Sequence, residues 1–549
     1  MPTITLNKKA FENYVGKKLP LDKLKDRISL LGTDLENVTD NEIIVEVFPN
    51  RPDMLSVQGF ARAFSSFIGA KTGLRHYKVE HSNEKMIIDK SVSNVRPYTA
   101  CAIIKDMHFN DEKIKEVIDI QEKLHITYGR HRKKAAIGIY PYEKIKAPIR
   151  FMAKKPEEIV FQPLEFPRKT NALEILKQHP AGREYGHLLE GREKFPVFID
   201  ANNEILSVPP IINSHKTGKI NEKTKDVFIE CSGFDFNVLQ KCLNMLAAAM
   251  AEMGGRIYSM DLIYGNKKFI TPDLNPEKMK VDIEYINKLL GLTLKEAEIK
   301  KLFERMGYGY KDKNALIPAY RADILHQADL AEDIAIAYGY ENFKSLIPNV
   351  ATIAEENKFE IFKNKISDLL TGLNFLETFT YNLTNRDFQC KKMQTDTDIV
   401  ELSNSISREY DVLRAWVLPS LMEIFGNNKH HEYPQRIFTI GKIFKKNNEF
   451  DTNIEENERI AVAIASEKTD YTEIRQILDY LIRSLDLKHE ITETEHSSFI
   501  TGRVGRVIVK EKKVAYIGEI SPEVIKNWDL EMPVTAFELN LSALFEVMK

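Results

Sequence analysis

Four acidic side chains within one short stretch are the clearest candidates for chemistry in this sequence. They are Asp323, Asp329, Glu332 and Asp333. On a helix, the last three are three and four residues apart and share one face, where like charges repel. A hard divalent cation would remove that repulsion, and an all-oxygen ligand set favours Mg²⁺ or Ca²⁺. A solvated acidic face near a helix N-terminus explains the same spacing, because the helix dipole favours acids there.

Apolar residues flank these acids, so we expect the helix to pack by its other side and to leave the acids on its outer face. The flanking residues are Ile324, Leu325, Leu330 and Ile334. A metal on such a face would lie at a contact with another chain.

A second candidate is the polar segment 208–235, which is dense in hydroxyl, amide and imidazole groups. Its candidate binding residues are Asn213, Ser214, His215, Thr217, Thr224 and Asp226. They could hold a small amino acid or a ribose through hydrogen bonds, on a loop supported by the apolar strand that follows. A long polar surface loop is the alternative. No Ser/Asp pattern accompanies His215, so the sequence does not predict a nucleophilic triad.

Two basic runs could contact RNA phosphates, although solvated surface explains them as well. One spans 130–134, and the other holds Lys429, His430, His431 and Arg436. A net charge of −2 gives no global attraction to nucleic acid, so any RNA contact must be local. The sequence has no phosphate-binding P-loop, HExxH or usable GxGxxG motif, so it predicts no self-sufficient ATP site.

The elements that must position these residues predict a multidomain α+β chain. The length of 549 residues suggests several domains, and we place them at 1–85, 86–268, 275–346 and 355–549. The second region mixes strands with helices, and the third combines two short helices with a small sheet, as in a winged-helix-like module. The fourth predicts an antiparallel sheet covered by helices. The four cysteines form no CxxC pair, and no apolar stretch has membrane length, so we expect a soluble intracellular protein.

Seven stretches, in the family's order, resemble the β subunit of phenylalanyl-tRNA synthetase of the archaeal and eukaryotic cytosolic type. The most specific is PAYRADILHQADLAEDIAIAYGYENF, at 318–343, which resembles the B5 domain. The stretch 45–64 resembles the first domain, B1. The stretches 121–143 and 209–235 resemble the B3/B4 editing domain, and 402–422, 438–444 and 518–541 resemble the catalytic-like domain.

The resemblance implies a cytoplasmic α₂β₂ ligase that attaches phenylalanine to tRNA-Phe with ATP. The α subunit would hold the aminoacylation site. The last domain of this chain would share the class II synthetase fold without its catalytic residues, and no Gly-rich run ending in Glu-Arg occurs between 355 and 549. The resemblance also predicts a chain without the inserted OB-type domain and the C-terminal anticodon-binding domain of bacterial β subunits.

The resemblance further implies roles for both candidate sites. The family's magnesium pattern, Asp-x5-Asp-x2-Glu-Glu/Asp, falls on the four acids, with Asp333 at the variable position, and the Mg²⁺ would be shared with the α subunit. The editing domain would hydrolyse tyrosine misattached to tRNA-Phe, a second sieve that an aromatic pocket needs against an added hydroxyl. Asn213, Ser214, His215 and Thr217 would line its pocket, and Glu230 would receive the tyrosine hydroxyl or orient water. A scaffold with an inactive editing pocket and a free-standing deacylase remain as alternatives.

Overall fold

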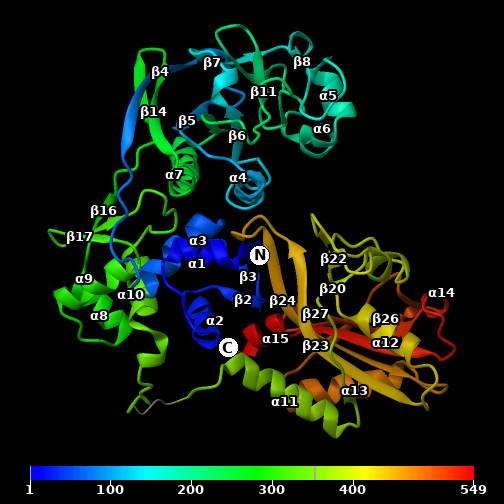
Figure 1. Ribbon diagram of the computed structural model, residues 1–549. Coiled ribbons are helices and arrows are strands. Elements are labelled where there is room, and N and C mark those ends of the chain that lie inside the picture. Colours follow the sequence, from blue (N-terminus) through cyan, green and yellow to red (C-terminus); the bar gives the residue numbers. More distant parts are fainter. Residues whose placement is uncertain (1, 351–353, 549) are drawn as a thin grey trace. The chain divides into compact units, whose positions relative to one another are not determined.

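The computed structural model describes residues 2–350 and 354–548, which form two compact units. The first ends at Ile347, and the second begins at Pro348. Figure 1 traces both along the sequence. Among the described residues, no helix combines the length and apolar content that a membrane crossing requires.

The chain begins with a small antiparallel sheet, ordered β1-β3-β2, and three helices. Turn chemistry at Pro52–Met54 leads into α3, which starts where the Ser56 hydroxyl accepts a hydrogen bond from the Gly59 amide at 3.0 Å. Val57, Phe60, Ala61, Phe64 and Phe67 recur at three- and four-residue spacing, which predicts a helix from Leu55, and α3 confirms that prediction. The elements are β1 (Thr3–Asn7), α1 (Lys8–Val15), α2 (Leu21–Leu30), β2 (Asp34–Val38), β3 (Glu42–Glu46) and α3 (Val57–Phe67).

A ten-stranded sheet follows, with the path β12-β11-β10-β7-β4-β14-β5-β13-β6 and β15 paired to β14. Its strands are β4 (Val79–Ile88), β5 (Tyr98–Lys105), β6 (Ala135–Pro141), β7 (Ile149–Lys154), β10 (Phe195–Ile199), β11 (Ile205–Val208), β12 (Ile212–Asn213), β13 (Val227–Gly233), β14 (Arg256–Tyr264) and β15 (Lys267–Thr271). A short hairpin, β8 (Val160–Phe161) with β9 (Thr170–Asn171), and helices α5 (Ala172–Gln178) and α6 (Pro180–Tyr185) lie between β7 and β10 along the chain. The sequence predicts strands at 100–104, 136–139 and 227–230, and the structure confirms them as parts of β5, β6 and β13 in this sheet.

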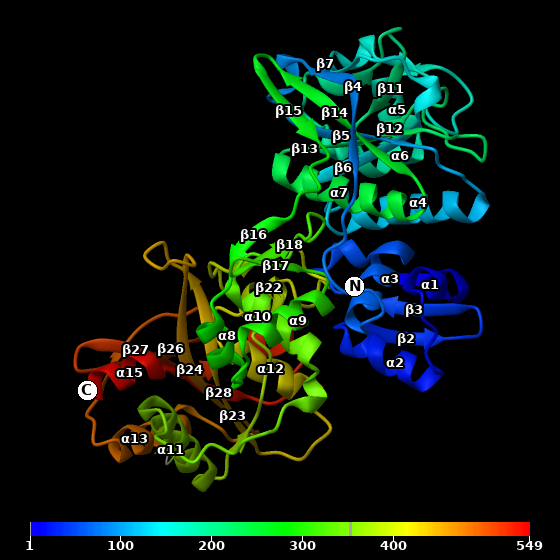
Figure 2. The same cartoon turned by 60° about the vertical axis from the view of Figure 1, so that its left-hand side comes forward.

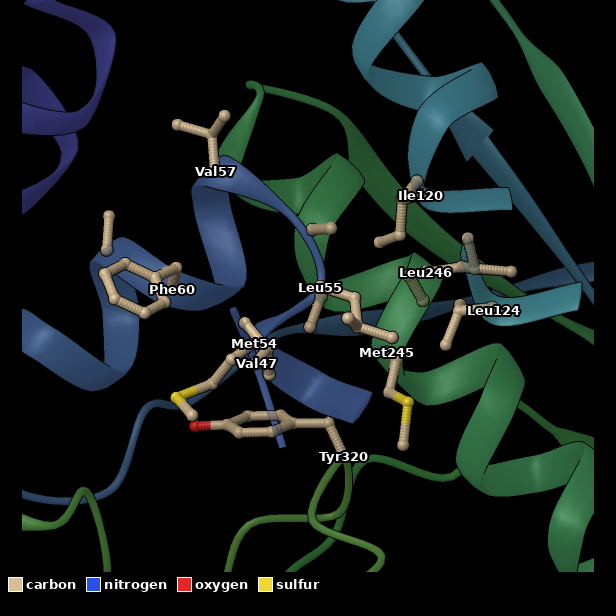
Figure 3. Close-up of a cluster of buried hydrophobic side chains, with 14 of the residues drawn as sticks. Val47, Met54, Leu55, Val57, Phe60, Ile120, Leu124, Met245, Leu246 and Tyr320 are labelled. Atoms are coloured by element: carbon tan, nitrogen blue, oxygen red, sulfur yellow. The ribbon is translucent and has the colours of Figure 1, made fainter. Parts of the chain in front are cut away.

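Helices α4 (Asp111–Ile126) and α7 (Phe236–Glu252) cover one face of this sheet. Figure 3 shows Met245 and Leu246 of α7 beside Leu55, with Leu124 of α4 close by. These side chains belong to one buried cluster that also holds residues of the first small sheet and of the three-stranded sheet at 277–317, so the first unit is organised around a shared core. The opposite face of the large sheet packs a second cluster of its own, including Tyr140 and Phe228.

The last part of the first unit has a three-stranded sheet, ordered β16-β18-β17, and three helices. The two predicted short helices are present, and a third carries three of the four acids. The elements are β16 (Glu277–Lys280), α8 (Ile283–Leu290), α9 (Glu296–Arg305), β17 (Gly309–Lys311), β18 (Asn314–Ile317) and α10 (Gln327–Tyr338).

The second unit is a seven-stranded sheet, ordered β19-β23-β24-β28-β27-β26-β25, and only its edge pair β19–β23 is parallel. Its strands are β19 (Leu376–Glu377), β23 (Gln435–Lys446), β24 (Ile454–Ala465), β25 (Glu490–Glu493), β26 (Phe499–Val509), β27 (Lys512–Ile520) and β28 (Val534–Asn540). A small side sheet, ordered β20-β22-β21, joins Leu383–Thr384, Val412–Leu413 and Val400–Glu401. The predicted antiparallel sheet is confirmed.

Helices cover both faces of this sheet, as can be followed in Figure 2. Alternate residues of β24 show the period of two: Val462 packs with one cluster, and Ala461 and Ala463 pack with the other. The cluster of Val462 includes α11 (Lys358–Gly372), α13 (Tyr471–Ser484) and α15 (Leu541–Met548). The other includes α12 (Leu418–Asn427) and α14 (Pro522–Asn527).

Candidate functional site

A cavity of about 220 Å³, which we call the seam cavity, lies where the two ends of the large sheet approach each other. β6 and β12 are the last strands of the sheet path and are not paired with each other, yet side chains from both meet here. The ionisable and hydrogen-bonding side chains that line the cavity include those of Glu122, His125, Arg132, Ser207, Asn213 and Glu230. The polar candidate loop therefore contributes to a cavity, but only through some of its residues.

The Tyr140 hydroxyl is the centre of the polar contacts at this seam. It lies 2.8 Å from Ser207 Oγ, 3.1 Å from Glu230 Oε1 and 3.3 Å from Asn213 Oδ1. Tyr140 comes from β6, Ser207 from β11 and Glu230 from β13, so three strands hold the group in place. Because one phenol has one proton, it can donate to only one of these oxygens at a time.

Glu230 is a buried carboxyl with half of its hydrogen-bonding capacity unused. Its side chain is 2% exposed, and within the described residues Oε2 has no hydrogen-bond partner. Burial raises the pKa of Glu230 to about 8, against the opposing effects of Tyr140 and Arg96. At neutral pH the group is therefore mainly the neutral acid, which can donate as well as accept a hydrogen bond.

Gly138 lies opposite Glu230 in the pairing of β13 with β6 and keeps this space open. A Cβ atom at position 138 would lie 2.2 Å from the Tyr140 hydroxyl oxygen and 2.5 Å from Glu230 Oε1. Any other residue would displace both polar groups, so the glycine is a steric requirement of the site.

Glu122, His125 and Arg132 form a second polar group at the cavity. The Ile137 amide donates to His125 Nε2 at 2.8 Å, which leaves the proton on Nδ1, 3.1 Å from Glu122 Oε1. Burial would raise the pKa of Glu122, but His125 and Arg132 outweigh it and hold that pKa at about 2. Burial lowers the pKa of His125. Both ring nitrogens are engaged within the protein, so His125 positions its neighbours and is not a free base.

Arg132 joins this group to the loop that closes the cavity. Its guanidinium donates to the carbonyls of Pro210 and Ile211, at 3.3 and 3.0 Å, and to Glu122 at 3.1 Å. It also lies 4.2 Å from the centre of the Tyr185 ring. The loop and the end of α4 are thus held together by one planar cation.

The basic run 130–134 follows α4 in an unusual backbone conformation. Residues 130, 131 and 132 all have positive φ, at 49°, 51° and 64°. This left-handed turn brings Arg132 to the cavity and leaves the flanking Arg130, His131 and Lys133 exposed. In the second basic run, Lys429 pairs with Asp529 and Arg436 pairs with Glu473, so two of its cations already have acidic partners.

The structure brings Asn213 and Glu230 together and places the other predicted pocket residues elsewhere. Ser214 is buried beside the cavity wall and its amide donates to Leu206, and the His215 side chain is exposed. Thr217 is buried, with its hydroxyl 3.5 Å from the Ile205 carbonyl. Of the two further candidates, Thr224 binds the Asn221 amide and Asp226 the Asp106 amide. None of these five lines the cavity.

Sequence reasoning missed Tyr140, Ser207 and the group of Glu122, His125 and Arg132. Alternation along the strand predicts an inward position for Tyr140, but its partners come from strands far away in sequence. Only knowledge of the strand order would have joined them.

The four acids are held by internal contacts in the described structure. Buried Arg321 donates to both oxygens of Asp323, at 2.8 and 2.7 Å, and to Asp333 at 2.8 Å. Asp333 also accepts a hydrogen bond from Tyr308 and is 4% exposed. The expectation that all four acids lie on an outer face is therefore wrong for Asp333, because Arg321 compensates its burial.

The remaining two acids lie at the start of α10. Asp329 accepts hydrogen bonds at 2.7 Å from the Leu325 and His326 amides, which makes it part of the helix cap. Glu332 is exposed, and partial burial together with the neighbouring acids raises its pKa. Across 2–350 and 354–548, no three His, Cys, Asp or Glu side chains are grouped as a metal ion requires. The carboxylates of this chain, as arranged here, do not form a complete Mg²⁺ site.

Comparison with known protein families assigns the parts of this chain. Residues 107–247 match the B3/4 domain and 279–340 match the tRNA synthetase B5 domain. Residues 344–541 match the phenylalanyl tRNA synthetase beta chain CLM domain. The fold is thus that of a multidomain α+β synthetase subunit.

Relatives of known name cover the chain from end to end. It is 40% identical to the phenylalanine–tRNA ligase beta subunit of Pyrococcus abyssi over all of both chains, and 38% identical to that of Archaeoglobus fulgidus over 100% of this chain and 99% of the relative. A crystal structure of an N-terminal fragment of the Pyrococcus horikoshii phenylalanyl-tRNA synthetase beta subunit is 35% identical, with a TM-score of 0.58. It covers 61% of this chain and 99% of the fragment. The chain belongs to the phenylalanine–tRNA ligase beta subunit family.

Proposed function

We propose that this chain acts in the cytoplasm as the β subunit of an α₂β₂ ligase and hydrolyses Tyr-tRNA-Phe in the seam cavity. The α partner would carry out the ATP-dependent attachment of phenylalanine to tRNA-Phe. The family supports the partner and the reaction. The observation that supports editing is the unpaired Oε2 of Glu230 in a cavity that opens between strands.

A ligand hydroxyl would complete the hydrogen bonding of Glu230, and a tyrosine side chain carries one where phenylalanine has only hydrogen. When phenylalanine occupies the cavity, the buried carboxyl stays unpaired, at a cost of about 1–3 kcal/mol. A pocket that must be hydrogen-bonded rejects the analogue without the hydroxyl, which is the selectivity that a second sieve needs. The Tyr140 hydroxyl contacts the carboxyl from the other side, and Asn213 Oδ1 lies within hydrogen-bond distance of that same hydroxyl.

The pocket supplies recognition of the amino acid, and its own side chains offer no free base. His125 has both nitrogens engaged, and Glu122 is held by His125 and Arg132. We infer that hydrolysis depends on holding the ester in place for attack by water, with Arg130, His131 and Lys133 available for the tRNA phosphates near the cavity.

The test uses the complex of this chain with its cognate α partner. We expect phenylalanine-dependent ATP–pyrophosphate exchange and release of tyrosine from Tyr-tRNA-Phe; a complex that does neither overturns the proposal. If the chain without its partner deacylates Tyr-tRNA-Phe equally fast, it is a free-standing deacylase. If the complex charges tRNA-Phe but leaves Tyr-tRNA-Phe intact, the chain is a scaffold with an inactive pocket.

We further propose that Asp323, Asp329, Glu332 and Asp333 contribute to a Mg²⁺ site that the α partner completes. The support is the raised pKa of Glu332, which burial and its acidic neighbours cause and which a cation would relieve. Because Arg321 already holds Asp323 and Asp333, Asp329 and Glu332 are the acids best placed to bind the ion.

The matched variants Glu332→Gln and Glu341→Gln distinguish this proposal from a purely solvated acidic face. Both residues are exposed, but Glu341 pairs with Arg27 and stands apart from the four acids. We expect only Glu332→Gln to lower the Mg²⁺ content of the purified complex, measured by elemental analysis. Full Mg²⁺ content in that variant would show that the acid is not a ligand.

A further inference from the structure

A second polar cavity, of about 290 Å³, lies within the second unit on the sheet face that α12 covers. Four cationic side chains and one carboxylate line it: Lys445, Arg459, Arg506, Lys513 and Glu538. They come from β23, β24, β26, β27 and β28, five neighbouring strands of the sheet seen in Figure 2. Neither the editing proposal nor the family comparison gives this cavity a role.

Strand register gathers these charges on one face. Arg506 pairs with Tyr516 across β26 and β27, and Tyr516 pairs with Glu538 across β27 and β28. Arg459 lies opposite Asn540 on the next strand. Arg459 and Arg506 are thus three strand spacings apart, about 14 Å along the sheet, so two long side chains can reach towards the same space between them.

Glu538 neutralises only one of the four cations. Its Oε2 accepts hydrogen bonds from the Val417 and Leu418 amides, each at 2.8 Å, and its Oε1 accepts one from Arg459 at 2.9 Å. The carboxylate is therefore occupied by the start of α12 and one guanidinium. It serves as a fixed part of the cavity wall.

Across residues 2–350 and 354–548, both arginines keep an unused donor and the two lysines are unpaired. The Nε atoms of Arg459 and Arg506 are buried and, among the described residues, have no hydrogen-bond partner. Arg506 lies 4.0 Å from the centre of the Tyr516 ring and donates to the Lys513 carbonyl at 3.3 Å, which fixes its plane. Within the part of the chain that the structure describes, the Lys445 and Lys513 ammonium groups make no ion pair.

One nearby acid reduces the positive charge without cancelling it. Glu455 stands opposite Lys445 in the β23–β24 pairing and accepts hydrogen bonds from the side chains of Asn447 and Asn457, and its charge attracts Lys445 and Arg459. Two carboxylates, Glu455 and Glu538, therefore face four cations. The cavity thus has an excess of positive charge in a partly desolvated space, where charge-assisted hydrogen bonds to an anion are strongest.

We propose that this cavity binds a small ligand bearing linked phosphate groups. Linked phosphates match cations that come from several strands, whereas one carboxylate would satisfy only one guanidinium. Arginine forks bind phosphate oxygens through paired donors, and the two lysines supply point charges at the rim. The site lies in the CLM-matching region of the second unit, whereas the editing cavity is built by residues of the first unit.

The test measures pyrophosphate binding to the full-length chain by calorimetry, without the α partner and at about 0.15 M salt to suppress non-specific attraction. We expect saturable binding to one site, weakened about tenfold or more in Arg506→Gln. Lys513→Gln should weaken pyrophosphate binding about threefold. Because Lys513 is exposed, this variant should fold normally, so it still tests the cavity if Arg506→Gln misfolds. The control is Arg503→Gln, on the same strand but paired with Glu519 outside the cavity.

Each outcome decides the proposal. Weakening in both cavity variants but not in the control supports it, and competition by ATP would extend the ligand to nucleotides. The absence of saturable binding overturns it, as does equal weakening in Arg503→Gln, which would indicate general surface attraction. Binding of a single-stranded RNA oligonucleotide without binding of pyrophosphate also overturns it, because the cavity would then be part of an RNA surface.

Discussion

Removing the Glu230 carboxyl should abolish the preference for tyrosine that we propose for the seam cavity. Glu230→Ala removes the buried carboxyl whose Oε2 has no hydrogen-bond partner among the described residues. A buried hydrogen bond of this kind contributes about 1–3 kcal/mol to discrimination, which corresponds to roughly 5- to 150-fold. We therefore expect the ratio of kcat/KM values for Tyr-tRNA-Phe and Phe-tRNA-Phe hydrolysis to fall by that factor, mainly through slower Tyr-tRNA-Phe hydrolysis.

The assay uses tRNA-Phe charged beforehand with each amino acid and follows release of the labelled amino acid by the αβ complex. Glu230→Gln, which keeps a neutral donor and acceptor at the same place, should retain most of the preference because the native group is itself mainly neutral at pH 7. Glu190→Ala, an exposed acid of the same domain, serves as the unaffected control. If Glu230→Ala keeps the wild-type ratio while folding normally, hydroxyl recognition by this carboxyl is refuted.

Three further predictions concern the pH dependence of Glu230, the glycine at position 138 and the ion pair of Arg321. The pKa of Glu230 is near 4.3 in the unfolded chain and about 8 in the folded protein, so its protonated form stabilises the fold. This contribution to the free energy of unfolding, at most about 5 kcal/mol, is fully present below pH 4.3 and is lost as the pH rises through 8. Hydrogen exchange of β13 amides, corrected for intrinsic rates, should show this loss in wild type and not in Glu230→Gln. Gly138→Ala should slow Tyr-tRNA-Phe hydrolysis at least tenfold, since its Cβ would lie 2.5 Å from Glu230 Oε1; wild-type activity would contradict the packing. Asp323→Ala should destabilise the α10 region by about 3 kcal/mol with or without Mg²⁺, because buried Arg321 loses a bidentate partner, and unchanged exchange of α10 amides would count against it.

Most of the fold could be predicted because its signals are local. The helical spacing after Leu55 and the apolar run 244–253 mark helices that the structure contains, and alternation marks β24, β26, β27 and β28. The order of strands could not be predicted in this way. β4 pairs in parallel with β14, whose residues follow more than a hundred positions later, and no local pattern specifies such a pairing.

The same difference between local signals and distant contacts decides how much of each candidate site could be predicted. The acids of α10 were found because helical spacing brings them together, yet their spacing gave no sign of Arg321. This arginine lies outside the helix and forms ion pairs with Asp333 of α10 and with Asp323, which precedes the helix. Spacing alone cannot distinguish a metal ligand from an ion-paired acid, since both require carboxylates on one face.

The seam cavity shows the opposite case, in which the decisive contacts are distant in sequence. Glu230 was singled out through the family resemblance, but the hydroxyl that orients it belongs to Tyr140, and the space beside it exists because position 138 is glycine. A residue's chemistry here depends on its neighbours across the sheet: β13 pairs with β6 in a register that sets Glu230 against Gly138. A shift of that register by one residue would turn the carboxyl to the face covered by α7, away from the Tyr140 hydroxyl that contacts it. The editing hypothesis is therefore as much a statement about strand register as about the identity of one acid.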